Sequence, residues 1–202
     1  RVRLFNGRDG EWRARITLTG KRRLTLECEA PSAPQREVPD VWLAFAPIKR
    51  IPADYVAQKA TELGVRALQP VITRRTVARR VNLDRLAANA IEAAEQSGRV
   101  SVPDIWPPAA LDALLDRWPA ERRLVFCDEA GEAAPIAAAL SAVRGPCGIL
   151  TGPAGGFAPE ERAAIRARPF ALPVTLGPRI LRADTAALAA LAIWQSLCGD
   201  WR

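Results

Sequence analysis

Two glycine loops in the last third of the chain constrain its fold more than any other feature of its 202 residues. The first glycine loop, residues 150–157, reads LTGPAGGF, and the second, residues 176–185, reads LGPRILRADT. Each loop follows a short apolar run and precedes a helical pattern, and the two loops begin 26 residues apart. Open α/β sheets bind ligands beyond the carboxyl ends of their strands. The pair of loops therefore predicts a ligand site at the ends of adjacent strands.

The chain after residue 38 alternates between strand patterns and helix patterns. Short apolar runs alternate with segments whose apolar residues recur every three to four positions. This alternation predicts a parallel sheet covered by helices. The expected strands are 41–46, 67–72, 124–127, 147–151 and 172–176, and the expected helices are 52–63, 83–97, 111–118, 135–143, a helix that starts at 159, and 183–197.

The helix expected over 83–97 has the clearest boundaries. Asn82 can cap its first turn, and Gly98 can end it. A single apolar face is expected to be buried, formed by Leu83, Leu86, Ala90, Ile91 and Ala94.

The first 29 residues predict antiparallel strands instead. Residues 6–10 read NGRDG, a strong hairpin signal, and the segments 11–18 and 24–28 alternate in polarity. Three short strands do not easily form a stable module alone. We therefore expect the end of a small β-barrel whose first strands are missing. The chain contains no methionine, which favours the same interpretation. Residues 30–39 contain three prolines and are expected to be a linker.

The composition narrows the classes of function. The net charge of +7 favours polyanionic partners, chiefly nucleic acid, although an arginine-rich genome would produce the same excess. Histidine is absent, which excludes Ser-His-Asp triads, Cys-His dyads and histidine metal sites. The cysteines lack metal-ligand spacing and are expected to be reduced thiols of a cytoplasmic protein. The longest apolar stretch of the last helix, residues 186–194, is too short to cross a membrane.

The glycine loops suit a nucleotide or a small anion. Glycine lets the backbone approach a ligand closely, and a helix N-terminus offers free N–H groups. Neither loop matches a Walker A motif or G-x-G-x-x-G, and ordinary tight turns are the alternative. Arg179 and Arg182 could bind RNA phosphate or a developing negative charge. A solvated charge is the alternative for Arg179, and a helix cap is the alternative for Asp184 and Thr185.

Basic pairs outside the loops are clustered, which favours nucleic acid over a purely compositional excess. They lie at a β turn, after the first α/β strand and in the segment 74–80. Lys59 and Glu62 are expected to form a helical ion pair, and Arg99 is expected near a helix C-terminus.

Four ordered motifs carry a family resemblance: residues 58–64 (QKATELG), 92–99 (EAAEQSGR), 151–157 (TGPAGGF) and 176–188 (LGPRILRADTAAL). With these motifs the chain resembles the RsmE family of SPOUT-class methyltransferases along nearly its whole length. The resemblance implies a methyltransferase that uses S-adenosylmethionine (SAM) to methylate N3 of one uridine in small-subunit ribosomal RNA.

The resemblance also implies an architecture and a site. Residues 1–37 would form a PUA-like RNA-binding barrel, here incomplete, with its linker, and residues 38–202 a SPOUT domain with a C-terminal trefoil knot. Members act as homodimers, without metal or membrane. The turn after residues 126–128 would add a third wall to the SAM pocket. The implied cofactor-binding residues are Leu150, Thr151, Gly152, Pro153, Gly155, Gly156, Leu176, Gly177, Ile180, Leu181 and Thr185. The implied RNA-binding residues are Arg22, Arg23, Lys49, Arg50, Lys59, Arg74, Arg75 and Arg99.

Methylation of N3 requires alignment with the methyl group, removal of the N3 proton and stabilisation of charge on O2 and O4. We assign charge stabilisation or phosphate positioning to Arg182, with help from Arg179. We assign removal of the N3 proton to Asp184 or to water. The chain departs from the family pattern at Ala154, where the first glycine loop usually has glutamate. The alternatives are another SPOUT enzyme, acting on tRNA or a ribose oxygen, and a non-catalytic ribosomal RNA assembly factor, which Ala154 favours.

Overall fold

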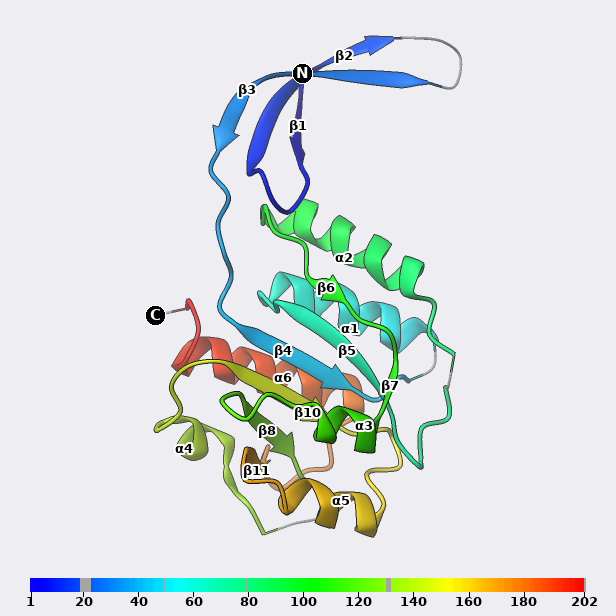
Figure 1. Cartoon of the computed structure of the whole chain (residues 1–202), viewed down its shortest axis with the longest axis vertical. Coiled ribbons are helices and arrows are strands. Elements are labelled where there is room, and N and C mark those ends of the chain that lie inside the picture. The colour runs from blue at the N-terminus through cyan, green and yellow to red at the C-terminus, as the bar shows by residue number, and fades with distance from the viewer. Residues whose placement is uncertain (19–22, 49, 79, 130–131, 202) are drawn as a thin grey trace.

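The computed structural model describes residues 1–18, 23–48, 50–78, 80–129 and 132–201. Within them the chain forms an antiparallel sheet near the N-terminus and a larger parallel sheet with helices on both faces (Figure 1). The strands are β1 (Val2–Phe5), β2 (Glu11–Leu18), β3 (Leu24–Ala33), β4 (Val41–Phe45), β5 (Ala67–Ile72), β6 (Asp104–Ile105), β7 (Ala109–Ala110), β8 (Arg123–Cys127), β9 (Ala134–Pro135), β10 (Cys147–Thr151) and β11 (Ala171–Thr175). The helices are α1 (Arg50–Glu62), α2 (Leu83–Ser97), α3 (Leu111–Asp116), α4 (Ile136–Leu140), α5 (Pro159–Arg166) and α6 (Ala183–Leu197).

The N-terminal sheet has the order β1-β2-β3. Its first turn is the predicted hairpin, in which the side chain of Asn6 accepts hydrogen bonds from the backbone N–H groups of Arg8 and Asp9. The last strand is longer than expected, because residues 30–33 still pair with β2. The expected linker therefore begins at Pro34 and not at Ala30.

The parallel sheet has the order β6-β5-β4-β10-β8-β11-β9, with β7 pairing to β5. The two strands that lead into the glycine loops, β10 and β11, are not adjacent, and the expectation that they would be is wrong. Both strands pair with β8, which lies between them. The segment after β8 therefore emerges between the two loops, at the same edge of the sheet.

Two apolar layers hold the sheet. One face carries α1, α4 and α6, and the opposite face carries α3 and α5. Side chains along β8 alternate between these layers: Val125 packs toward α6, and Leu124 and Phe126 pack toward α5. Complete burial of side chains this size contributes about 1.5–3 kcal/mol each. This alternation fixes which side chains at the strand ends face each layer.

Helix α2 has the predicted boundaries. The side chain of Asn82 accepts a hydrogen bond from the backbone N–H of Arg85, and Gly98 ends the helix with φ +70°. The buried face is shifted from the expected one. Ala93 is buried while Ile91 is 45% exposed, because Leu86, Ala90, Ala93 and Ala94 follow one helical stripe that Ile91 leaves.

Other element ends differ from the sequence expectations. Helix α4 ends at Leu140, where the hydroxyl of Ser141 donates to the carbonyl of Ala138 and competes with helix continuation. In α6 the N-cap position is Arg182, so capping does not explain Asp184. Instead, Asp184 accepts a hydrogen bond from the backbone N–H of Thr185 in the first turn. Among the described residues, no helix is long and apolar enough to span a membrane.

Candidate functional site

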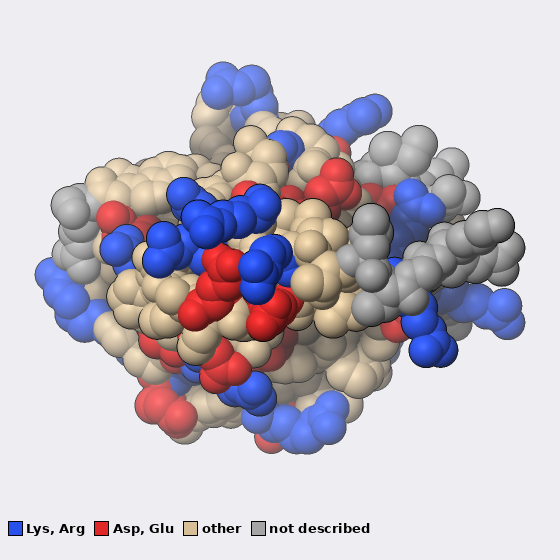
Figure 2. Space-filling view, turned by 90° about the horizontal axis from the view of Figure 1, so that it is seen from above, with Lys and Arg blue, Asp and Glu red and all other residues tan. Residues whose placement is uncertain are grey.

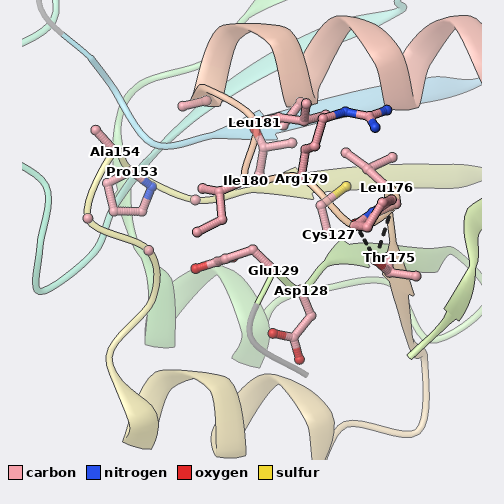
Figure 3. Close-up of a pocket in the computed structure, with 18 residues that line it drawn as sticks. Cys127, Asp128, Glu129, Pro153, Ala154, Thr175, Leu176, Arg179, Ile180 and Leu181 are labelled. Carbon is pink, nitrogen blue, oxygen red and sulfur yellow. Dashed lines mark hydrogen bonds between the residues drawn. The ribbon is translucent and has the colours of Figure 1, made fainter. Parts of the chain in front are cut away.

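A cavity of about 310 Å³ lies at the carboxyl ends of β10, β8 and β11 (Figure 3). Its walls are the first glycine loop, residues 127–129 at the end of β8, and the second glycine loop. Small-molecule sites typically occupy roughly 300–1,000 Å³. The expected third wall after residues 126–128 is present, and the position of β8 between the two loop-bearing strands explains it.

The first glycine loop needs its glycines for steric reasons. Gly156 has φ +67°, a conformation that other residues rarely adopt. A Cβ atom on Gly152 would lie 2.7 Å from the ring of Phe157. Gly156 also donates a hydrogen bond to the carbonyl of Pro153, which closes the loop into a turn. The backbone of this turn therefore forms the cavity wall itself.

Thr151 places an unpaired polar group in the cavity wall. The residue is 1% exposed, yet its Oγ1 has no hydrogen-bond partner within the described part of the chain. A buried hydroxyl without a partner costs about 1–3 kcal/mol. Because Thr151 lines the cavity, a bound molecule with a hydroxyl, amine or carbonyl group could supply the missing partner.

The wall after β8 combines a neutral thiol with two carboxylates. Burial, together with the charge of Glu129, raises the pKa of Cys127 to about 12. Burial alone would also raise the pKa of Asp128. However, hydrogen bonds from Arg162 and Arg166 of α5 outweigh burial and hold that pKa below its usual range. Asp128 points toward α5 in Figure 3, so its role is to anchor the wall.

Glu129 lies on the opposite side of this wall from α5. Its Oε1 lies almost at the point that a Cβ on Gly156 would occupy, so the carboxylate fills the space left by that glycine. In Figure 3 the Glu129 side chain extends beneath Ile180 toward the first glycine loop. The cavity therefore has a negative group beside its glycine wall, where it can attract a cationic ligand.

The second glycine loop closes the cavity from the α6 side. Gly177 has φ +106°, and its N–H donates to Thr175 Oγ1 at 3.2 Å. Ile180 is 87% exposed although it lines the cavity. Most of the predicted cofactor residues line this cavity: Thr151, Gly152, Pro153, Gly155, Gly156, Leu176, Gly177, Ile180 and Leu181.

Two predicted cofactor residues do not line the cavity. Leu150 is fully buried in the apolar layer beside α5, because neighbouring residues of a strand face opposite sides of the sheet. Thr185 is exposed on the first turn of α6. Sequence reasoning also missed Thr175, Pro178 and Ala186, which do line it.

A second cavity of about 510 Å³ adjoins the first. It contains Arg182, Asp184 and Arg75, with Pro47 and Val77 at its sides. The two cavities have shared walls formed by Pro153, Ala154, Gly155, Ile180, Leu181 and Ala183. The predicted catalytic residues are thus divided: Arg179 lines the first cavity, whereas Arg182 and Asp184 line the second. Pro47, just past β4, could have been expected here because parallel strands end at one edge.

The predicted RNA-binding residues have different surroundings. Arg74 and Arg75 are exposed, but only Arg75 lines the second cavity, and Arg23 is exposed just before β3. Lys59 forms the expected ion pair with Glu62, at 2.7 Å. Arg22, Lys49 and the side chain of Arg50 lie outside the described residues.

Arg99 is half-buried between the end of α1 and the segment after α2. Its guanidinium donates to the backbone carbonyls of Thr61, Val65 and Ser101 at 2.7–2.8 Å. Burial lowers the pKa of Arg99 to about 10, so the side chain stays charged at neutral pH. This placement gives Arg99 a structural role that joins α1 to the segment after α2.

The basic side chains of the N-terminal sheet are accompanied by carboxylates. Arg3 pairs with Glu11 at 3.5 Å and Arg15 with Glu27 at 3.0 Å. Figure 2, which looks down on this end of the molecule, shows blue and red side chains interleaved. The positive charge on this face is therefore partly neutralised. No group of three or more metal-ligating side chains occurs in the described residues.

Comparison with known proteins identifies the family. The model of an RNA methyltransferase domain matches residues 35–195. A protein named ribosomal RNA small subunit methyltransferase E, from Rickettsia conorii, is 32% identical over 193 residues, covering 95% of this chain and 78% of the relative. The chain belongs to this RNA methyltransferase family.

Further relatives agree with this family. A protein of the same name from Synechocystis is 33% identical over 195 residues, covering 94% of this chain, although this chain spans only 63% of that relative. The crystal structure of ribosomal RNA small subunit methyltransferase E from Neisseria gonorrhoeae, bound to S-adenosyl methionine, superposes with a TM-score of 0.89 at 32% identity. That comparison covers all of this chain and 85% of the other. The fold is therefore that of the family's SAM-binding methyltransferases.

Proposed function

We propose that this chain, a SAM-dependent ribosomal RNA methyltransferase by family, methylates N3 of a uridine in small-subunit ribosomal RNA. The target implied by the resemblance is uracil-1498 of 16S ribosomal RNA. The observation that supports the proposal best is the pair of adjoining cavities. One has glycine-loop walls and a carboxylate, and the other has basic side chains. A methyl donor in the first and a base in the second would meet at the shared walls.

The residues of the first cavity fit SAM. SAM carries a positive sulfonium, an ammonium group and ribose hydroxyls, and when bound it supplies the methyl group. Glu129 offers a carboxylate to the positive groups, and the unpaired hydroxyl of Thr151 offers a hydrogen-bond partner. The backbone of residues 152–156 and 176–181 would hold the rest of the molecule. The neutral thiol of Cys127 adds no charge to this cavity.

The second cavity supplies the groups that reaction at N3 requires. The N3 nitrogen of uracil becomes a nucleophile when its proton leaves, and charge then develops on O2 and O4. The guanidinium of Arg182 can donate hydrogen bonds to such an oxygen. Asp184 lines the same cavity and can accept the proton, directly or through water. Arg179 belongs to the first cavity, where it would orient the loop or contact the RNA backbone nearby.

The remaining architecture is part of the proposal. Residues 1–37 would be the RNA-binding PUA-like module with its linker, and residues 38–202 the SPOUT domain with its trefoil knot. The antiparallel pairing of β1–β3, distinct from the parallel sheet, is consistent with this division. We also propose that two copies associate as a homodimer, and that the protein acts in the cytoplasm, where ribosomal subunits are assembled. Light scattering coupled to size-exclusion chromatography would measure the mass of the assembly.

A direct experiment tests the reaction. Small ribosomal subunits from a strain that lacks the gene would be incubated with the protein and SAM, and the RNA digested and analysed by mass spectrometry. We expect 3-methyluridine to appear at a single site. Methylation of a ribose oxygen, or methylation of tRNA alone, would refute the proposed target.

One residue favours a different class of function. Ala154 stands where this loop usually has glutamate. A non-catalytic assembly factor would tolerate the loss of that carboxylate. Calorimetry with SAM separates the two classes, because an assembly factor need not bind the cofactor. Submicromolar to micromolar binding is expected for the methyltransferase, and absence of binding would favour the assembly factor.

A further inference from the structure

Arg75 connects the two cavities. Its Nη1 donates a hydrogen bond to the carbonyl of Gly155 at 2.8 Å, across 80 residues of sequence. The aliphatic part of Arg75 also lies against this glycine, since a Cβ on Gly155 would be 3.7 Å from Arg75 Cδ. Gly155 belongs to a wall of both cavities, and Arg75 itself lines the second.

Residues 152–156 of the first glycine loop form few hydrogen bonds with other elements. Within the described segments, Arg75 is the only side chain of another element that forms a hydrogen bond with residues 152–156. Ala154 cannot provide a polar contact of its own. The position of the cofactor wall therefore depends on a side chain from the segment after β5.

The segment that carries Arg75 is held in place by hydrogen bonds of neighbouring residues. Thr73 and Thr76 are 4% exposed, and their side-chain oxygens are joined by a hydrogen bond of 2.8 Å. The backbone N–H of Arg74 donates to Glu161 Oε1 at 2.8 Å, and Glu161 Oε2 accepts from the N–H of Ala158. The turn is thus fixed to the start of α5, just beyond the loop. Because the backbone at Arg75 is held by these contacts, its guanidinium can hold the loop in place.

We propose that Arg75 is a positioning residue that couples RNA binding in the second cavity to cofactor binding in the first. This inference rests on the proposed function. A guanidinium has five N–H donors, and the bond to Gly155 uses one of them. An RNA phosphate or base oxygen can bind the others without breaking the bond to Gly155. Binding of RNA then immobilises the guanidinium, which holds the cofactor wall in its binding conformation.

The expected coupling is positive and reciprocal. Bound RNA raises cofactor affinity by about fivefold to tenfold, a range typical of coupled sites, and bound cofactor raises RNA affinity by the same factor. Arg75→Ala removes the connection, so the factor falls to about one. The cofactor affinity of the free protein falls by about fivefold, as expected for the loss of one exposed hydrogen bond.

Equilibrium dialysis with labelled S-adenosylhomocysteine tests the inference, because this product analogue binds without methylating the RNA. Its affinity is measured with and without unmethylated small ribosomal subunits, for the wild-type chain and for Arg75→Ala. Arg74→Ala is the matched control. It removes a neighbouring positive charge whose ion pair with Glu160 is 65% exposed on both sides, and it retains the backbone bond to Glu161. We expect the control to weaken RNA binding while keeping the coupling factor.

The outcomes separate the inference from the proposed function. If the wild-type chain binds no S-adenosylhomocysteine, the proposed function fails and the inference fails with it. If the wild-type chain binds both partners and Arg75→Ala retains the full coupling factor, the inference alone is overturned. Equal loss of free-protein cofactor affinity in Arg74→Ala would also overturn the inference.

Discussion

Replacement of Asp128 by asparagine should strongly destabilise the protein. The Asp128 carboxylate is fully buried and accepts hydrogen bonds from Arg162 at 2.8 Å and from Arg166 at 2.8 Å. Asparagine has nearly the same shape but carries no charge, and its NH₂ group would face a guanidinium. The substitution therefore tests the electrostatic contacts with little change in packing.

The structure sets the size of this effect. Removal of one partner from a buried ion pair costs about 3–5 kcal/mol. The two arginines are 24% and 36% exposed, so water can partly solvate them once the carboxylate is lost. We therefore expect the lower end, a loss of about 3 kcal/mol in the free energy of unfolding. Cofactor affinity should fall as well, because residues 127–129 form a wall of the first cavity.

Urea denaturation followed by circular dichroism would measure the loss. Asp116→Asn is the matched control, because it breaks another carboxylate–arginine pair, with Arg168, in which Asp116 is 64% exposed. Exposed pairs contribute roughly 0–1 kcal/mol. If Asp128→Asn lowered stability no more than Asp116→Asn, the assignment of Asp128 as an anchor for this wall would be wrong.

The pH dependence gives a second test of the same contacts. The folded protein holds the pKa of Asp128 below its unfolded value, which is about 3.9. The stabilisation is therefore complete above pH 3.9 and is lost as the pH falls through the folded pKa. The stability gap between the wild type and Asp128→Asn should be constant from pH 5 to 8 and should narrow in stronger acid. A gap that widened in acid would contradict this reasoning.

Three further substitutions separate ligand binding from folding. Thr151→Val should leave the free energy of unfolding equal or higher, because it removes an unpaired buried hydroxyl. The same substitution should lower SAM affinity about fivefold. Denaturation measures the first effect and calorimetry the second. Gly156→Ala should lower SAM affinity about tenfold, since a left-handed conformation costs a non-glycine residue about 1–2 kcal/mol and Glu129 must move; unchanged affinity would count against the glycine wall. Arg99→Met should lower the free energy of unfolding by about 2–4 kcal/mol, while the folded variant keeps its RNA affinity in filter binding. A selective loss of RNA affinity would instead support a role of Arg99 in RNA binding.

Local patterns along the chain predicted most of the fold. Asn82 and Gly98 marked the ends of α2, and apolar runs marked each long strand of the parallel sheet. The sheet order was less accessible, because the position of β8 between β10 and β11 depends on pairing between distant segments. The two-residue strands β6, β7 and β9 carry no periodic signal of their own.

The site was predicted to the extent that glycine and strand ends reveal it. Glycines 152, 155 and 156 indicated a cavity wall in which the backbone itself faces a ligand. Leu150 was assigned to that wall because it is next to Thr151 in sequence, although the alternation of the strand turns it to the other face. The structural role of Arg99 depends on carbonyl groups 34 and 38 residues earlier in the chain, which no local pattern encodes.

The place of β8 in the sheet has a consequence for the order of folding. Each glycine loop emerges from a strand that pairs with β8, but β8 precedes both strands in the chain. The cavity therefore cannot exist until β11 has docked beside β8, however early the other strands assemble. SAM can select only the completed arrangement, and a ligand at one hundred times its dissociation constant stabilises such a state by about 2.7 kcal/mol. In the cell, the cofactor would then protect finished molecules from unfolding without helping nascent ones to form.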